Sequence, residues 1–143
     1  MSQNLTTKRY NHMVTDIQAS YHEAAWRLGL SDSAMLILYT VSHNGEKCLL
    51  NDITSSSGIS KQTMNSALRK LEAEDIVYLE STGGRKKMVY LTAKGKEVAQ
   101  NTVYKVLEIE NEIFDSWTGQ ERTVYLELTH KYLTTLKRKV KEL

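Results

Sequence analysis

Apolar residues recur every three or four positions through most of this chain, which is the spacing of one buried face of a helix. The pattern predicts a first helix over residues 5–27. A second helix is predicted to begin after Ser31, whose hydroxyl can cap it, and to end near His43. A third helix is predicted to follow Ser60, and its buried stripe consists of Ile59, Met64, Ala67, Leu68 and Leu71.

Two more helices are predicted toward the end of the chain. The first is a long helix that starts at Thr92 and carries apolar residues as far as Trp117. The segment from Thr118 to Glu121 then has the spacing of a capping box, so a final helix is predicted to begin at once. The apolar stripe of this final helix is Tyr125, Leu128, Tyr132, Leu136, Val140 and Leu143.

This final stripe is too long for a small domain to cover by itself. The simplest cover is the same helix of a second copy, with the first helix and the long helix from Thr92 completing the core of a homodimer. The alternative is a helix that folds back on its own chain. The residues predicted to form the dimer interface are Tyr10, Ile17, Trp117, Tyr125, Leu128, Tyr132, Leu136 and Val140.

A strand pattern replaces the helical one after the third helix. Residues 76–80 and 87–92 alternate apolar with polar side chains, and the loop between them holds Gly83 and Gly84 followed by three cations. A helix-turn-helix followed by such a hairpin is a winged helix-turn-helix. The flexible basic tip suits insertion into the minor groove of DNA, with Arg85 as the inserted side chain. The alternative is an ordinary solvated basic loop.

The outward face of the third helix is rich in hydrogen-bond donors. Gln62, Asn65 and Arg69 have the side-chain geometry that reads base edges in the major groove, whereas Lys61, Ser66 and Lys70 could hold phosphates. The alternative is the solvated face of a surface helix. The residues predicted to contact DNA are Ser60, Lys61, Gln62, Thr63, Asn65, Ser66, Arg69, Lys70, Arg85, Lys86 and Lys87.

Charge is segregated along the chain, although the net charge is only +2. Residues 60–96 contain eight Lys or Arg and four Asp or Glu, whereas residues 97–130 contain two and seven. A basic region that meets phosphates and an acidic region held away from them favours nucleic-acid binding. The 143 residues fit one domain, and the lack of a leader or a long apolar run predicts a cytoplasmic protein with no membrane segment.

Three short motifs match a known family. The first motif is Leu71-Glu72 with Asp75-Ile76-Val77, at the end of the third helix and the entry to the wing. The second is Gly83-Gly84-Arg85 in the wing loop, and the third is Leu91-Thr92-Ala93-Lys94-Gly95 after the wing. In this layout the chain resembles the MarR family of bacterial transcriptional regulators. The resemblance implies a mainly α fold, with a winged helix at residues 30–95 and dimerisation helices at residues 1–29 and 96–143.

The resemblance also implies a function. It implies a homodimeric regulator, expected to be a repressor, that binds a pseudo-palindromic operator in double-stranded DNA. Two positions depart from the family pattern: Gly83 replaces an Asp that braces the wing Arg, and Thr54 replaces a small residue. Members of the family often bind an effector between the dimer helices and the winged helix. The residues predicted to line such a pocket for a small aromatic or lipophilic compound are Tyr21, Trp26, Tyr39 and His43, with simple core packing as the alternative.

Other functional classes have less support in the sequence. There is no phosphate-binding Gly loop, nucleophile elbow or metal-ligand doublet, so no enzyme, cofactor or metal site is predicted. The four histidines, with Glu23, lack close ligand spacing, and Cys48 is predicted to be packed and unreactive. The rival hypothesis is a winged helix that binds protein, although such a surface would expose more aromatic residues and Met.

Overall fold

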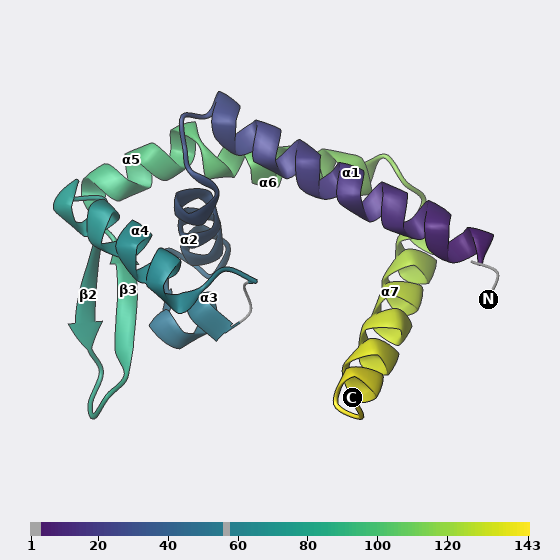
Figure 1. Ribbon diagram of the computed structural model, residues 1–143. Coiled ribbons are helices and arrows are strands. Elements are labelled where there is room, and N and C mark those ends of the chain that lie inside the picture. Colours follow the sequence, from purple (N-terminus) through teal and green to yellow (C-terminus); the bar gives the residue numbers. More distant parts are fainter. Residues whose placement is uncertain (1–3, 56–57) are drawn as a thin grey trace. The chain divides into compact units, whose positions relative to one another are not determined.

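The computed structural model describes residues 4–55 and 58–143, and it divides into two compact units. The first unit, Met1–Val106, contains a three-stranded sheet and most of the helices. The second unit, Leu107–Leu143, contains the rest of α6 and all of α7. The elements are α1 (Leu5–Arg27), α2 (Asp32–His43), β1 (Lys47–Leu49), α3 (Leu50–Ser55), α4 (Lys61–Ala73), β2 (Val77–Ser81), β3 (Lys87–Leu91), α5 (Ala93–Asn101), α6 (Val103–Asp115) and α7 (Gly119–Val140) (Figure 1).

Side-chain caps start the helices where the sequence predicts them. The hydroxyl of Ser31 accepts the first-turn amide of α2, and that of Ser60 accepts the amide of Thr63 at 3.2 Å in α4. At the start of α7, Thr118 and Glu121 form a complete capping box with hydrogen bonds of 2.8 and 3.1 Å. Each cap satisfies amides that the helix leaves without a partner, so the three predicted starts are confirmed.

The end of α4 turns the chain directly into β2. The amide of Asp75 donates to the Glu72 carbonyl at 3.0 Å, and the amide of Ile76 donates to the Leu71 carbonyl at 2.9 Å. This pattern needs a left-handed residue, and Asp75 supplies it with φ of 61°. Asp tolerates this conformation better than most side chains because its short polar group can bond locally.

The sheet has the strand order β1-β3-β2, and both pairings are antiparallel. The predicted hairpin is confirmed, with Val77 opposite Leu91 and Leu79 opposite Val89, and β1 adds a third strand through Cys48 opposite Val89. Val77, Val89 and Leu91 face the core and are buried. The register therefore fixes which face of the wing strands packs under the helices.

The core of the first unit forms around α2. Ile37, Leu38 and Val41 of this helix are at most 1% exposed, and α2 packs against α4. From α4, Met64, Leu68 and Leu71 are buried, while Ala67 and Ile59 are partly buried against the same cluster. The predicted stripe is therefore confirmed, and it determines which side of α4 faces solvent.

The segment after the wing is two helices, so the prediction of one long helix from Thr92 to Trp117 is wrong. Thr102 separates α5 from α6 with φ of −130° and ψ of −90°. Its hydroxyl donates to the Val98 carbonyl at 2.7 Å, which competes with the backbone for that acceptor. Trp117 lies beyond the end of α6 and directly before the cap of α7.

The start of α5 lies against the end of α4. Thr92 caps α5 through the Gly95 amide at 2.8 Å, and its hydroxyl also lies 2.6 Å from the Asp75 carbonyl. A Cβ added to Gly95 would overlap the carbonyl oxygen of Ile76. The motif from Leu91 to Gly95 therefore has a structural reason, since it brings α5 within backbone contact of the segment that leads into β2.

The second unit is organised around the corner between α6 and α7. The Arg122 guanidinium donates to the carbonyls of Phe114 and Trp117 at 2.8 and 2.7 Å. The rings of Phe114, Trp117 and Tyr125 lie with centroids 5.1 to 6.1 Å apart. These contacts satisfy the end of α6 and hold the corner together.

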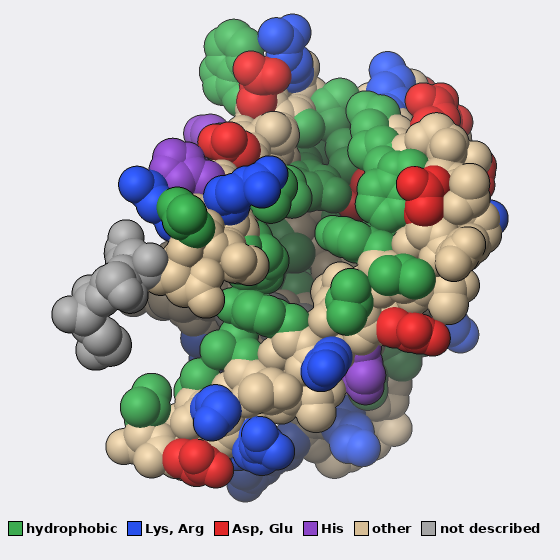
Figure 2. Space-filling view, turned by 90° about the vertical axis from the view of Figure 1, so that its right-hand side faces the viewer, with side chains coloured by type: hydrophobic (Ala, Val, Ile, Leu, Met, Phe, Trp, Pro, Cys, Tyr) green, Lys and Arg blue, Asp and Glu red, His purple; other side chains and the backbone are tan. Residues whose placement is uncertain are grey.

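No residue of α7 is buried within the described chain. All six apolar residues of the predicted stripe are exposed, from 45% at Tyr125 to 104% at Leu143. Figure 2 shows hydrophobic side chains open to solvent. Within the described residues, no helix is both long and apolar enough to cross a membrane.

Cys48 lies in β1 and is 6% exposed, as predicted for a packed thiol. Burial, and to a smaller extent the negative charge of Asp52, raises the pKa of this thiol from 9.0 to about 11. The thiol is therefore protonated at neutral pH. Among the described residues, no three His, Cys, Asp or Glu side chains gather as a metal site.

The raised pKa of Cys48 predicts a loss of stability in alkali. The folded state holds the thiol proton more tightly than the unfolded state, so its contribution is complete below pH 9 and is lost as the pH rises through about 11. Urea unfolding at pH 8 and pH 10.5 should show a larger loss for the wild type than for Cys48→Ala, which lacks the thiol. Equal losses would contradict the assignment.

Candidate nucleic-acid interface

The outward side of α4 is polar and open to solvent. Lys61, Gln62, Ser66 and Arg69 are exposed, and Asn65 is half-buried. These positions alternate with the buried stripe of the same helix, so burial of the stripe forces them outward. The result is a helix face of amides, hydroxyls and cations, as the sequence predicts.

The wing presents its cations at the end of a two-stranded hairpin that projects from the helices (Figure 1). Gly83 and Gly84 have φ of 110° and 61°, conformations that favour glycine. The turn is closed by the Thr82 amide, which donates to the Lys86 carbonyl at 3.1 Å. The exposed residues Arg85, Lys86 and Lys87 follow directly, so the glycines allow a turn that places three cations together.

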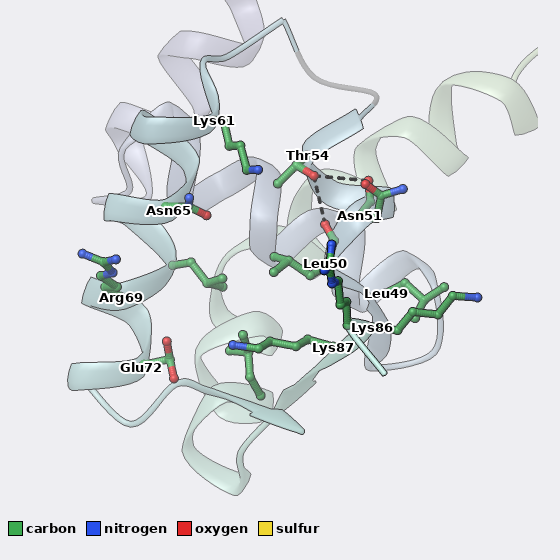
Figure 3. A pocket seen from close by; sticks show the side chains of 13 residues that line it. Leu49, Leu50, Asn51, Thr54, Lys61, Asn65, Arg69, Glu72, Lys86 and Lys87 are labelled. Atoms are coloured by element: carbon green, nitrogen blue, oxygen red, sulfur yellow. Dashed lines mark hydrogen bonds between the residues drawn. The ribbon is translucent and has the colours of Figure 1, made fainter. Parts of the chain in front are cut away.

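A groove lies between α4, α3 and the wing strands (Figure 3). Its apolar part comes from four leucines, and its polar part consists of five cations, two Asn, one Thr and one carboxylate. The lining residues are Leu49, Leu50, Asn51, Thr54, Lys61, Asn65, Leu68, Arg69, Glu72, Leu79, Arg85, Lys86 and Lys87. The groove is therefore strongly positive although the chain as a whole is nearly neutral.

The groove brings together about half of the residues predicted to contact DNA. Those that line it are Lys61, Asn65, Arg69, Arg85, Lys86 and Lys87. The other predicted residues belong to the exposed side or the cap of α4 and do not line the groove: Ser60, Gln62, Thr63, Ser66 and Lys70. Ser60 and Thr63 also bond to each other through their hydroxyls at 2.8 Å, so both take part in the cap.

Three polar residues of the groove were not predicted as site residues. Asn51 and Thr54 come from α3, a helix of six residues with no clear periodic pattern in the sequence. The Thr54 hydroxyl lies 3.4 and 3.3 Å from the carbonyls of Leu50 and Asn51, so it bonds back to its own helix (Figure 3). Glu72 faces the groove from the last turn of α4. The only feature of the sequence that singled out Glu72 was its place in the Leu71-Glu72 motif.

The groove has the chemistry of a phosphate-binding surface. Arg and Lys contact phosphate oxygens, while Asn can pair with an adenine edge. In a winged helix, a helix in the major groove and a wing in the next minor groove hold between them the sugar–phosphate strand that separates the two grooves. The sequence model of the MarR family matches residues 28–87, which include α2, β1, α3, α4 and β2 and end at the first residue of β3.

Over residues 28–87 the chain is similar to the MarR family.

Solved structures of MarR proteins have the same fold. A MarR family regulator from Neisseria meningitidis is 19% identical with a TM-score of 0.78, and the match covers 96% of each chain. A MarR family transcriptional regulator from Streptomyces coelicolor, in complex with DNA, is 18% identical with a TM-score of 0.71, over 92% of this chain and 86% of that chain. No curated protein sequence matches.

A third similar structure concerns the control of DNA binding. Bordetella bronchiseptica BpsR, whose DNA binding is regulated by 6-hydroxynicotinic acid, is 18% identical with a TM-score of 0.61, over 87% of this chain and 98% of that chain. At these identities the likeness to solved structures concerns the fold. The matched layout confirms the winged helix that the sequence predicts.

The aromatic residues predicted as an effector pocket come from two helices of the first unit, α1 and α2. Tyr39 and His43 stack on α2 with ring centroids 5.9 Å apart. Tyr21 and Trp26 lie on α1 and are 39% and 75% exposed. The effector pocket stays a prediction.

Proposed function

We propose that this protein is a MarR-type, sequence-specific regulator of transcription that binds double-stranded DNA through α4 and the wing. The observation that carries the proposal is the groove with five cations between these two elements. Asn65 and Arg69 are assigned to base edges, and Lys61 and the three wing cations to phosphates. The exposed Gln62, Ser66 and Lys70 extend the same surface along α4.

We further propose that the active species is a homodimer built on α7 and α1. Exposed apolar residues of α7, from Val124 to Val140, span about 200° of its circumference at about 100° per residue. One facing helix covers only about 100°, so more than one helix must pack on α7. Tyr10 and Ile17 of α1, 38% and 51% exposed, are assigned to the same interface.

Such a dimer determines the kind of DNA site. Two copies of α4 related by a two-fold axis reach successive major grooves when the half-sites are about one helical turn apart. The operator is therefore expected to be a pseudo-palindrome, and its occupancy would hinder transcription. A small aromatic or lipophilic effector would release the protein from the operator only if it bound better to a dimer whose two α4 helices do not match the groove spacing than to one whose helices do. This activity places the protein in the cytoplasm.

A winged helix that binds protein is the alternative function. The outward side of α4 exposes cations, amides and hydroxyls and carries no aromatic side chain, which favours DNA. We assign no enzymatic activity to this chain, because the groove is lined by the groups that bind phosphate backbones. Steep dependence of binding on salt distinguishes the two functions, since displaced counterions accompany phosphate contacts.

Two alanine variants test the division of labour in this interface. We expect Asn65→Ala to cost about 1 to 3 kcal/mol on the preferred duplex and to relax sequence preference, because a base contact is lost. Lys86→Ala should weaken binding to all duplexes alike and reduce the salt slope by about 1. Fluorescence anisotropy at several salt concentrations measures both effects. If wild-type binding proved insensitive to salt, the proposed function would be wrong.

A further inference from the structure

Glu72 is the one carboxylate among the residues that line the groove. Its side chain is exposed, and among the described residues its carboxylate has no hydrogen-bond or ion-pair partner. Figure 3 shows it at the lower end of α4, on the side of the groove where Lys87 extends from β3. A surface that binds phosphates through five cations therefore also contains one unneutralised negative charge.

The position of Glu72 along α4 determines what it would meet. Recognition helices contact base edges mainly through their N-terminal residues, and Glu72 is the second-to-last residue of the helix Lys61–Ala73. It also lines the side that faces the wing strands. It would therefore lie beside the sugar–phosphate strand and away from the base edges.

We propose that Glu72 repels the phosphate strand at this end of the groove and so limits the affinity of the protein for DNA of any sequence. The proposal rests on the function proposed above. At about 6 Å and an effective dielectric constant of about 40, a carboxylate and a phosphate repel by the equivalent of a tenfold change in affinity. The repulsion acts on every duplex, because phosphates are the same in all of them.

Glu72 also limits the number of phosphates that the groove can neutralise. A cation beside a free carboxylate is partly neutralised by it, so it displaces fewer counterions from DNA. Loss of the carboxylate would make one such cation, Lys87, fully available to the phosphates. The salt dependence of binding would then become steeper by about one contact.

The test compares Glu72→Gln with Glu74→Gln in the full-length protein. Both substitutions raise the net charge by one, but Glu74 does not line the groove. Anisotropy titrations with a random-sequence duplex at four salt concentrations measure affinity and salt slope. We expect Glu72→Gln to bind about tenfold more tightly, with a slope steeper by about 0.9, and Glu74→Gln to change affinity less than twofold at about 0.15 M salt.

The outcomes separate this inference from the proposed function. If the wild type binds DNA in a salt-dependent manner and the two variants behave alike, the repulsion is absent although the function stands. Weaker binding by Glu72→Gln would mean that the carboxylate accepts a hydrogen bond from DNA, which also overturns the proposal. If the wild type binds no duplex at low salt, the proposed function itself fails. Glu72→Ala, with thermal unfolding of each variant, checks that the fold is intact.

Discussion

Gly95→Ala is expected to destabilise the protein by about 2 to 4 kcal/mol. The new methyl group would overlap the carbonyl oxygen of Ile76, a backbone atom that cannot turn aside. The Thr92 amide donates to the same carbonyl at 3.0 Å, so a shift of α5 would break this bond as well. Overpacking costs about 1 to 3 kcal/mol and each lost hydrogen bond about 1 kcal/mol.

The loss is measured by urea unfolding at one fixed protein concentration, because dimerisation couples stability to concentration. Gly119→Ala is the matched control. It also adds one methyl group near the start of a helix, but the nearest atom would be a side-chain nitrogen of Arg122 at 3.8 Å. We expect this control to be neutral or up to about 1 kcal/mol more stable. Equal effects of the two substitutions would show that α5 does not approach Ile76 as described.

Leu136→Glu is expected to raise the dissociation constant of the dimer at least about 100-fold, because each copy would bury an unpaired carboxylate in the interface. Leu136 is 46% exposed in the single chain and lies within the apolar arc of α7. Affinity for a duplex with two half-sites should fall in parallel, since a monomer holds only one of them. Analytical ultracentrifugation measures the first effect and anisotropy the second.

Thr134→Glu provides the control for the dimer variant. It introduces the same charge two residues earlier, about 200° around the helix at about 100° per residue, and away from the apolar arc. Thr134 is exposed, so this variant should dimerise like the wild type. A dimer that survives Leu136→Glu and fails with Thr134→Glu would place the interface on the other side of α7.

Local chemistry made much of the fold predictable. Caps at Ser31, Ser60 and Thr118 depend on residues one turn away, and the stripe of α4 depends on a period of 3.6. The hairpin was also predictable from local sequence, because the alternating apolar and polar residues of its strands and the glycines of its turn are neighbours in the chain. Thr102 interrupts a helix with a bond from its own side chain, which the apolar pattern does not reveal.

The groove was less predictable because its walls come from separate elements. The cations of α4 and the wing stood out by type, but Asn51 and Thr54 enter the site only because α3 packs beside β1 and β3. Glu72 belongs to a family motif, and nothing in the sequence tells which way its side chain points. The dimer interface and the effector pocket depend on a second chain and a ligand, so they stay predictions.

The central claim is that two copies of α4 and its wing read duplex DNA together. Selection of preferred sites from random duplexes by the purified protein tests it most directly. The expected result is an inverted repeat whose half-site centres lie about 10 to 10.5 base pairs apart, flanked by positions without preference. Recovery of no enriched sequence at low salt, or of a single motif without a repeat, would contradict the claim.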